Sequence, residues 1–240
     1  LDEKCYLLTP AEENEAGTMW NNPQIDLKEP FDTTVQVMLG CNDTNGGDGI
    51  VFVFQPHSLS VGNYMGHMGF EFISNTFAIE IDTYQNPEHN DPSYDHLAII
   101  REGIVDHQAP ENLAGPIQAN PSNPNIEDCQ YHSLRVLWNP DDQELKVYWN
   151  CEFRLSYSGN IINDIFNGNS VVFWGFTGGT SDVVNQQEVC IDKGFDLNLL
   201  EDVTLCPRGE FELQAPIEGL SYKWSPDHGL SATDIPNPTA

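Results

Sequence analysis

Short runs in which apolar residues alternate with polar ones recur along most of the chain, a pattern typical of β-strands. The runs are rich in β-branched and aromatic residues, and clusters of turn-forming residues such as NDTNGGDG and NPEHNDPS separate them. Nine runs fit this description: 33–40, 49–55, 77–84, 96–103, 132–139, 143–150, 152–159, 169–176 and 186–193. Helical periodicity is almost absent. The pattern predicts an all-β fold, an antiparallel β-sandwich with long loops at its edges.

Two of the runs are apolar on both faces, which is expected for strands at the centre of two stacked sheets. They are VFVF at 51–54 and VVFWGF at 171–176. The segment 143–159 predicts a β-hairpin with a tight turn near Asn150. The tryptophans of the strands are expected in the core: Trp138, Trp149 and Trp174.

The composition changes at about residue 195. The segment 195–240 is rich in proline, carries its own Trp224 and is too short for a complete immunoglobulin-like sandwich, which needs about 100 residues. Its sequence YKWSPDHGLS resembles the start of an Ig-like or PKD-like module of large bacterial surface proteins. We therefore predict a β-sandwich domain over 1–194 and a partial Ig/PKD-like module over 195–240. A structured C-terminal extension of the first domain is the alternative.

The charge balance narrows the choice of partners. The chain has 37 acidic and 9 basic residues and a formal net charge of -28. Such a field repels phosphate backbones, so nucleic-acid binding is excluded as a function, whereas divalent cations are attracted. No run of 18 or more apolar residues occurs, so membrane insertion is not expected.

Six cysteines lie far apart, without a CxxC pair that would indicate a zinc site. Their even number favours disulfides and an oxidising, extracellular setting, with free buried thiols as the alternative. We expect Cys5 to pair with Cys190, which would join the two ends of one domain, and Cys41 to pair with Cys129. The partners of Cys151 and Cys206 are left open.

The segment AIEIDTYQNPEHNDPSYDH at 78–96 concentrates side chains that can bind metal ions. Side chains alternate faces along a strand, so those of residues 80, 82, 84 and 86 point the same way. The Asn-Pro and Asp-Pro dipeptides then turn the chain and can return Asp91 and His96 over that face. Carboxylate and amide oxygens suit calcium and an imidazole suits a transition metal, so the segment could hold two different ions.

The pattern ExDxYxN followed by DPSYxH resembles the metal loop of the legume-type (L-type) lectins. This resemblance implies a concanavalin A-like jelly roll that binds Ca²⁺ and a transition metal, usually Mn²⁺. The carboxylates matching Asp82 and Asp91 bridge the two ions in that family. The resemblance places the carbonyl of Tyr84 and the amide oxygen of Asn86 on calcium. It places the two remaining ligands on the transition metal: Glu80 and His96.

Three further segments extend the resemblance over roughly residues 4–192. GGDGIVFVFQ resembles the strand that begins with a sugar-binding aspartate, here Asp48, which the family holds after a cis peptide bond; Gly47 precedes it where the family often has alanine. MGHMGFEF resembles the glycine loop and gives Gly66 a backbone N–H contact with sugar. VVFWGFTGGTSD resembles the strand and loop that tune sugar preference, with Gly179 and Thr180 at the tip. CYLLTPA and ENLAGP resemble L-type lectin modules of Bacteroidetes surface and gliding-associated proteins.

The resemblance implies non-catalytic sugar binding. Asp48 would accept hydrogen bonds from two adjacent sugar hydroxyls, and Asn86 would donate its side-chain N–H to one of them. Tyr84 is the expected stacking platform for the sugar ring, ahead of Tyr64 and Phe70. Lone histidines are interpreted as surface or internally satisfied residues: His57, His107 and His132.

Two alternative functions stay open. Laminarinase-type endo-β-glucanases share the jelly-roll architecture and use an ExDxxE motif, but here Gln85 occupies the place of the second glutamate that a retaining hydrolase needs. The chain lacks the GxSxG and HExxH motifs of other enzymes. The other alternative is a metal-stabilised adhesive module that binds protein instead of sugar.

The expected partner is therefore a glycan or polysaccharide, and the expected location is extracellular, secreted or on a bacterial cell surface. The resemblance leaves the sugar open between mannose or glucose and galactose. It also leaves two oligomeric states open, a homodimer through the back sheet or a single module on a stalk.

Overall fold

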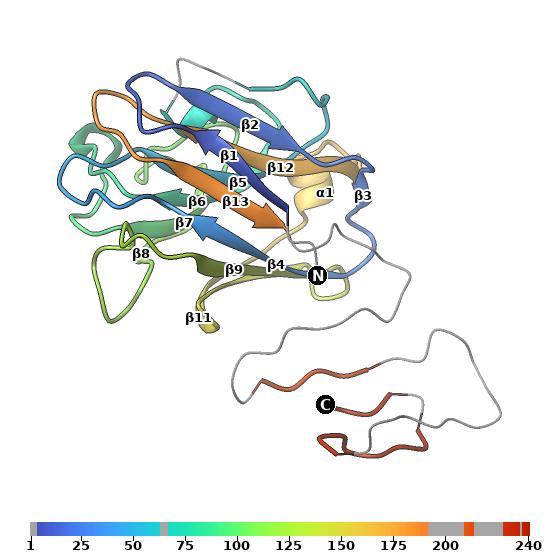
Figure 1. Ribbon diagram of the computed structural model, residues 1–240. Helices are drawn as coiled ribbons and strands as arrows, with labels where there is room; N and C mark the ends of the chain where they lie inside the picture. Colours follow the sequence, from blue (N-terminus) through green and yellow to red (C-terminus); the bar gives the residue numbers. More distant parts are fainter. Residues whose placement is uncertain (1–3, 63–66, 192–208, 214–227, 236) are drawn as a thin grey trace. The chain divides into compact units, whose positions relative to one another are not determined.

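The computed structural model describes residues 4–62, 67–191, 209–213, 228–235 and 237–240 (Figure 1). The chain divides into two compact units, Leu1–Phe195 and Asp196–Ala240. All the named strands and helices lie in the first unit.

The first unit is a sandwich of two antiparallel sheets (Figure 1). The six-stranded sheet, called the back sheet below, has the order β1 (Lys4–Thr9), β13 (Gln187–Ile191), β4 (Phe31–Met38), β9 (His132–Asn139), β10 (Glu144–Trp149) and β11 (Glu152–Ser158). Six strands of the seven-stranded front sheet follow the order β2 (Ala16–Trp20), β12 (Val171–Gly179), β5 (Gly49–Gln55), β6 (Phe77–Asp82), β7 (His96–Arg101) and β8 (Asn112–Gln118). The seventh strand of this sheet, the short β3 (Ile25–Asp26), pairs with β12 outside this order.

Helical structure is confined to three short pieces in the described part of the chain. One is α1 (Ile161–Asp164), and the others are the single 3-10 turns η1 (His67–Gly69) and η2 (Pro87–His89). Asn160 caps α1 by accepting a hydrogen bond from the backbone N–H of Asn163 at 3.1 Å. This agrees with the near absence of helical periodicity in the sequence.

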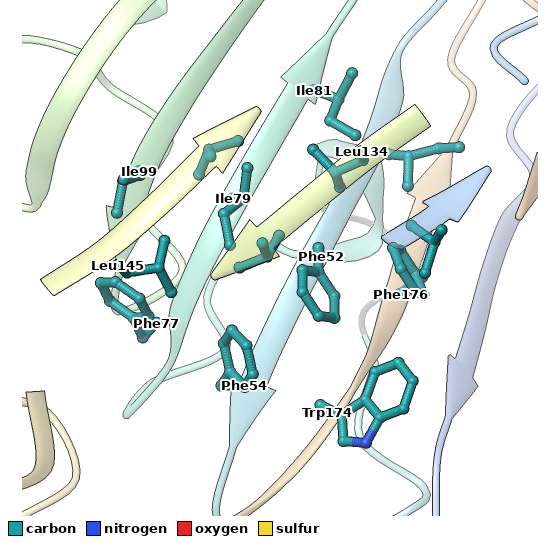
Figure 2. Packing of buried hydrophobic residues seen from close by; sticks show 14 of the residues in the cluster. Phe52, Phe54, Phe77, Ile79, Ile81, Ile99, Leu134, Leu145, Trp174 and Phe176 are labelled. Carbon is teal, nitrogen blue, oxygen red and sulfur yellow. The ribbon is translucent and has the colours of Figure 1, made fainter. Parts of the chain in front are cut away.

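The main core lies between the sheets (Figure 2). Alternate residues of the front strands, such as Phe52 and Ile79, meet inward residues of the back sheet, such as Leu134 and Leu145. Phe52 stacks on Phe176 with ring centroids 4.8 Å apart. The three tryptophans expected in the core are at most 2% exposed, which confirms that prediction: Trp138, Trp149 and Trp174.

The outer face of the front sheet is also covered. Val51, Val53, Ala78 and Ala98 form a second cluster with residues of η1 and of the loop after β7. Consequently β5 is buried on both faces, as its continuous apolar run predicts. In the second predicted run, at 171–176, Val171 is exposed and Phe173 is half-buried, so the prediction holds only for the rest of that run. β6 is also buried on both faces, although its sequence contains Glu80 and Asp82. The metal-ligand candidates described below lie on this outer face.

The predicted sandwich and all nine predicted strands are confirmed. The hairpin is confirmed too, because Asn150 and Cys151 form a two-residue turn with φ of 47° and 70° between β10 and β11. The strands without a sequence prediction lie mostly at sheet edges: β1, β2, β3 and β8. β8 contains Gly115 and Pro116, residues that weaken a strand signal but are tolerated at an edge.

Two disulfides are found as predicted, Cys5–Cys190 and Cys41–Cys129. The first joins directly paired residues of β1 and β13, the two ends of the sandwich. Cys151 is also disulfide-bonded, and Cys206 lies outside the described residues. These bonds fit an extracellular or lumenal location.

Most of the segment 195–240 lies outside the described residues. In the second unit Glu212 and Thr239 form an isolated antiparallel bridge. The domain boundary at 194 and the Ig/PKD-like module, including Trp224, stay predictions. In the part of the chain that the structure describes, no helix is long and apolar enough to cross a membrane.

Candidate functional site

Three adjacent strands of the front sheet bring the first candidate ligands together. Asp82 at the end of β6 is paired with Gly49 of β5 on one side and with His96 of β7 on the other. Glu80 lies two residues earlier on β6, so its side chain points to the same outer face as that of Asp82. The register therefore places two carboxylates and one imidazole side by side. The period-2 pattern predicts the shared face of the two carboxylates, and the return of the chain predicts the position of His96.

The loop after β6 returns Asp91 to this group. The 3-10 turn η2 closes with Asn90 at φ 64°, a left-handed conformation that asparagine tolerates. The backbone N–H of Asn86 donates to Oδ2 of Asp91 at 2.7 Å, which fixes the carboxylate over the strand ends. Ligand atoms of Asp82, Asp91 and His96 all lie within 4.8 Å of one another. The predicted return of the chain is confirmed.

His107 joins the same group, and the interpretation of this residue as an isolated surface or satisfied histidine is wrong. Its side chain is only 2% exposed, and its Nε2 lies 2.7 Å from Nε2 of His96. It also lies 3.5 Å from Oε2 of Glu80 and 3.4 Å from Oδ1 of Asp91. We call these five residues the histidine–carboxylate cluster: Glu80, Asp82, Asp91, His96 and His107.

Burial dominates the electrostatics of this cluster. It raises the pKa of Glu80 well above its usual value, and the Asp91 charge raises it further. The pKa of Asp82 is raised in the same way by burial and by the charges of Glu80 and Asp91. Burial and the neighbouring His107 lower the pKa of His96 to about 3. Burial therefore favours the protonated, neutral form of the carboxyls and the neutral form of the imidazole.

Neither oxygen of Glu80 has a hydrogen-bond partner among the described residues, although the side chain is fully buried. Among the described residues, the basic groups within ion-pair distance of Glu80 and Asp91 are His96 and His107. Burial lowers the pKa of both imidazoles and so opposes their protonation.

Asp82 and Asp91 each accept one backbone N–H, from Tyr84 at 2.8 Å and from Asn86 at 2.7 Å. Carboxylate oxygens and imidazole lone pairs that converge in a buried site around Glu80, which has no donor in the described part of the chain, fit a divalent cation. The donor set thus suits the ions expected from the sequence.

Asp48 lies at the edge of the cluster, directly before β5. The peptide bond between Gly47 and Asp48 is cis, as the resemblance implies. The backbone N–H of Asp48 donates to the carbonyl of Gly179 at 2.9 Å, and its carbonyl accepts from the N–H of Thr83 at 3.0 Å. Ser181 donates its hydroxyl to Oδ1 of Asp48 at 2.9 Å, and burial raises the pKa of this carboxyl.

Gly47 is required by the packing around this bond. Its φ is 148°, and a Cβ atom would lie 2.8 Å from Cγ2 of Val183 and 3.0 Å from Cβ of Tyr84. Alanine, which the family often has here, therefore does not fit without movement. Glycine at this position allows Val183 and Tyr84 to approach the backbone before Asp48 closely.

The other predicted sugar contacts have different environments. Tyr84 and Asn86 are half-buried beside the cluster. Gly179 contributes its carbonyl to Asp48, whereas the Thr180 hydroxyl is engaged with residues 12–15 of the β1–β2 loop, donating to the Glu12 carbonyl at 2.7 Å. Gly66 and Tyr64 lie outside the described residues.

Phe70 is not a stacking platform. Its side chain is 0% exposed and belongs to the second apolar cluster, so the lesser alternative that places a sugar against it is wrong. The sequence signal for Phe70 was its proximity to the glycine loop, and the structure turns the ring inward.

Two histidines without a predicted role border the site. The rings of His67 and His89 lie 4.5 Å apart in a T-shaped arrangement. His67 also lowers the pKa of Asp48 and of Asp91 electrostatically, although burial has the larger, opposite effect on both. Ser181 and these histidines come from separate loops, and only the fold brings them together.

The fold and the gathered residues define a two-sheet β-sandwich with a candidate metal centre beside a cis-peptide aspartate. The chain belongs to the family described as the legume lectin beta-barrel domain, whose model matches residues 2–193. Membership in a lectin family indicates a non-enzymatic, carbohydrate-binding protein. The endo-β-glucanase alternative, already weakened by Gln85, is thereby disfavoured.

Solved structures with the same fold have low sequence identity. Lectin I-B4 from Griffonia simplicifolia in its metal-free form has a TM-score of 0.61 and 18% identity, over 77% of this chain and 84% of that chain. Basic winged bean lectin with Tn-antigen has a TM-score of 0.59 and 14% identity, over 78% and 84%. The Ca²⁺-bound exoplasmic/lumenal domain of VIP36 has a TM-score of 0.57 and 19% identity, over 79% of each chain.

Proposed function

We propose that the chain is a calcium- and transition-metal-dependent carbohydrate-binding domain of a secreted or cell-surface bacterial adhesin. The observation that carries this proposal is the position of Asp48, a buried carboxylate held after a cis peptide bond at the edge of the histidine–carboxylate cluster. Bound cations would neutralise the cluster and rigidify the strand ends and loops that present Asp48. The sugar would then bind to a preformed site, and less conformational entropy would be lost on binding.

The proposed ion ligands follow from the donor chemistry. Asp82 and Asp91 would serve both ions, because each carboxylate offers two oxygens and both groups lie at the meeting point of β6 and its loop. The Tyr84 carbonyl and the Asn86 amide oxygen would complete the calcium side. Glu80 and His96 would complete the transition-metal side, with Mn²⁺ or another transition metal.

Sugar contacts would lie on the solvent side of this centre. Asp48 would accept hydrogen bonds from two adjacent hydroxyls, and the Asn86 amide would donate to one of them. Tyr84 is the proposed stacking surface, and Gly66 keeps its proposed backbone contact. Gly179 and Thr180 would act by shaping the 178–182 loop, given the bonds that hold their polar groups.

A homodimer, if the chain forms one, would use a surface different from the sugar site. The second copy would dock on the outer face of the back sheet. Leu7 on β1 and Phe153 on β11 are 57% and 52% exposed on this sheet. The dimer stays a proposal, independent of the sugar site.

The proposal is tested with Asp48→Asn, which keeps the size of the side chain but removes its charge. Wild-type protein loaded with calcium and a transition metal is expected to bind members of a glycan array, and EDTA-treated protein is not. A hydrogen bond to a charged group contributes about 1.5–3 kcal/mol, so the variant should bind at least about tenfold more weakly. Isothermal titration with the best glycan measures the difference.

Asp43→Asn is the matched control, because Asp43 is an exposed acid in the same loop. It is expected to bind like wild type. Full binding by Asp48→Asn would refute the placement of the sugar site. A silent array with the metals present would refute the proposed function and favour the adhesive module that binds protein.

A further inference from the structure

His107 occupies a position that none of the six sequence-predicted ligands covers. Its Nε2 lies 2.7 Å from Nε2 of His96, 3.5 Å from Oε2 of Glu80 and 3.4 Å from Oδ1 of Asp91. Neighbouring ligands on one ion at about 2.1 Å are about 3.0–3.4 Å apart in octahedral and tetrahedral geometry. The distances from His107 to Glu80 and Asp91 are therefore close to those of ligands that share an ion, and the distance to His96 is shorter.

The backbone holds His107 in this place from two sides. Its N–H donates to the carbonyl of His89 at 2.9 Å, and its carbonyl accepts from the Asn112 amide at 3.1 Å. Asn90 also donates to Oδ1 of Asp106 at 2.7 Å. These hydrogen bonds connect the turn that carries His107 to the loop that carries Asp91 and to the start of β8. They therefore fix the backbone position from which the imidazole enters the cluster.

An outer hydrogen bond of His96 directs the Nε2 lone pair of this residue into the cluster. A backbone hydrogen bond at Tyr94 favours a proton on His96, and because Nε2 faces His107 this proton belongs on Nδ1. An outer partner of this kind commonly orients an imidazole that binds a metal. Nδ1 of His107 has no hydrogen-bond partner among the described residues, and Asn112 holds the backbone carbonyl of His107 instead.

A simple hydrogen bond between the two histidines explains the site less well. One N–H shared between them would engage both Nε2 atoms, but the carboxylate oxygens of Glu80 and Asp91 that face Nε2 of His107 would take no part in this bond. Both oxygens of Glu80 would still lack a donor among the described residues. A single cation interacts with all of these atoms at once, which a single proton cannot do.

We propose that His107 is a second imidazole ligand on the transition-metal side of the centre and that it shifts the preference of this side from manganese towards zinc, nickel or cobalt. The inference rests on the proposed metal binding and deepens it. Carboxylates and water suit manganese, whereas each added imidazole favours the later divalent metals. A centre with two imidazoles is thus expected to discriminate more strongly than one with a single histidine.

The test compares metal selectivity in wild type and His107→Ser. Metal-free protein is incubated with saturating calcium and equal concentrations of zinc and manganese, desalted, and analysed by mass spectrometry for bound metals. The ratio of zinc to manganese is expected to fall at least about tenfold in the variant, in line with the tenfold or larger effects of altering ligand environments. Bound calcium should not change.

His89→Ser is the matched control, because His89 lies on the adjoining loop outside the cluster and its backbone contact with His107 is retained. It is expected to keep the wild-type ratio. His107→Gln keeps the size of the side chain and should behave like His107→Ser. Cobalt-loaded wild type and variants give a second readout, since loss of an imidazole changes the visible absorption of the ion.

A further measurement uses only the wild-type protein, so it does not depend on whether a variant folds. In ¹⁵N-labelled protein, zinc loading is expected to shift the Nε2 resonances of two histidines, and a shift of only one would overturn the proposal. An unchanged zinc-to-manganese ratio in folded His107→Ser would overturn it as well. A loaded protein that keeps this selectivity but binds no glycan would refute the proposed function and leave the His107 assignment intact.

Discussion

Two groups of buried acids lie next to each other in this molecule and are stabilised differently. In the histidine–carboxylate cluster, Glu80 is fully buried, and neither of its oxygens has a hydrogen-bond partner in the described part of the chain. In the second group, Asp95 accepts a 2.7 Å hydrogen bond from the N–H of Ile126, and Oε1 of Glu127 accepts one from the Asn185 amide. Of the two oxygens of the Glu127 carboxyl, only Oε2 lacks a hydrogen-bond partner among the described residues. We call the second group the Asp95–Glu127 pair.

Burial is the largest influence on the carboxyls of both groups, and it raises the pKa of Asp95 to about 7 and that of Glu127 to about 9. A buried carboxyl with an amide neighbour can be accommodated by holding a proton. The first group has converging imidazole lone pairs instead, so a cation is the better neutralising partner. The comparison shows that burial and acidity are common to both groups; the difference is that Glu80 has no hydrogen-bond donor among the described residues and faces imidazole nitrogens.

Removing metal should have the largest effect and should separate the two groups. Ligand binding at 100 to 1,000 times its dissociation constant stabilises a protein by about 2.7–4.1 kcal/mol, so EDTA should lower the melting temperature by about 5–15 °C. The disulfides remain intact during this treatment. Differential scanning calorimetry with and without EDTA measures the change.

The Glu80→Gln substitution tests the same point at one residue, because its effect on the melting temperature should depend on whether metal is bound. In loaded protein the variant loses a charged ligand and should melt below wild type. In metal-free protein it removes a buried carboxyl that has no hydrogen-bond donor among the described residues and lies beside other acids, and it should melt at or above wild type. An equal loss of stability in both states would show that Glu80 acts only through packing.

A smaller, pH-dependent effect is expected at Glu127. Its pKa is about 9 in the folded protein against an ordinary value of 4.5, so between these values the folded state binds more protons than the unfolded state. Stability from this group is therefore present at low pH and declines as the pH rises from about 4.5 to about 9. Glu127→Gln keeps an acceptor for Asn185 but does not titrate.

The melting temperature of Glu127→Gln relative to wild type should therefore increase between pH 5 and pH 8.5. The expected increase is at least about 2–4 °C, which corresponds to about 1 kcal/mol in a domain of this size. Saturating metal in both samples keeps the histidine–carboxylate cluster loaded. A difference that stays constant across this range would mean that Glu127 is ionised in the folded protein.

The sequence predicted the parts of the site that depend on local geometry. Strand alternation places Glu80 and Asp82 on one face, and the proline-rich turn returns Asp91 and His96, so the four residues were identifiable from spacing. The resemblance to L-type lectins supplied the cis bond before Asp48. The central strands were equally clear, because burial on both faces gives continuous apolar runs.

Long-range contacts account for what the sequence did not reveal. His107 reaches the cluster through backbone bonds to His89 and Asn112, which are not encoded in the spacing from His96. Ser181 reaches Asp48 across the fold in the same way. Edge strands such as β8 were missed because half-exposed strands with glycine and proline have weak patterns.

The most direct test of metal binding by the histidine–carboxylate cluster is the metal content of reconstituted protein. Wild type is loaded with calcium and zinc, freed of unbound ions by gel filtration and analysed by mass spectrometry. One calcium and one zinc per chain are expected, with zinc lost in Glu80→Gln and retained in Glu127→Gln. A chain that holds no transition metal, or that holds it equally in both variants, would contradict the assignment of the ion to this cluster.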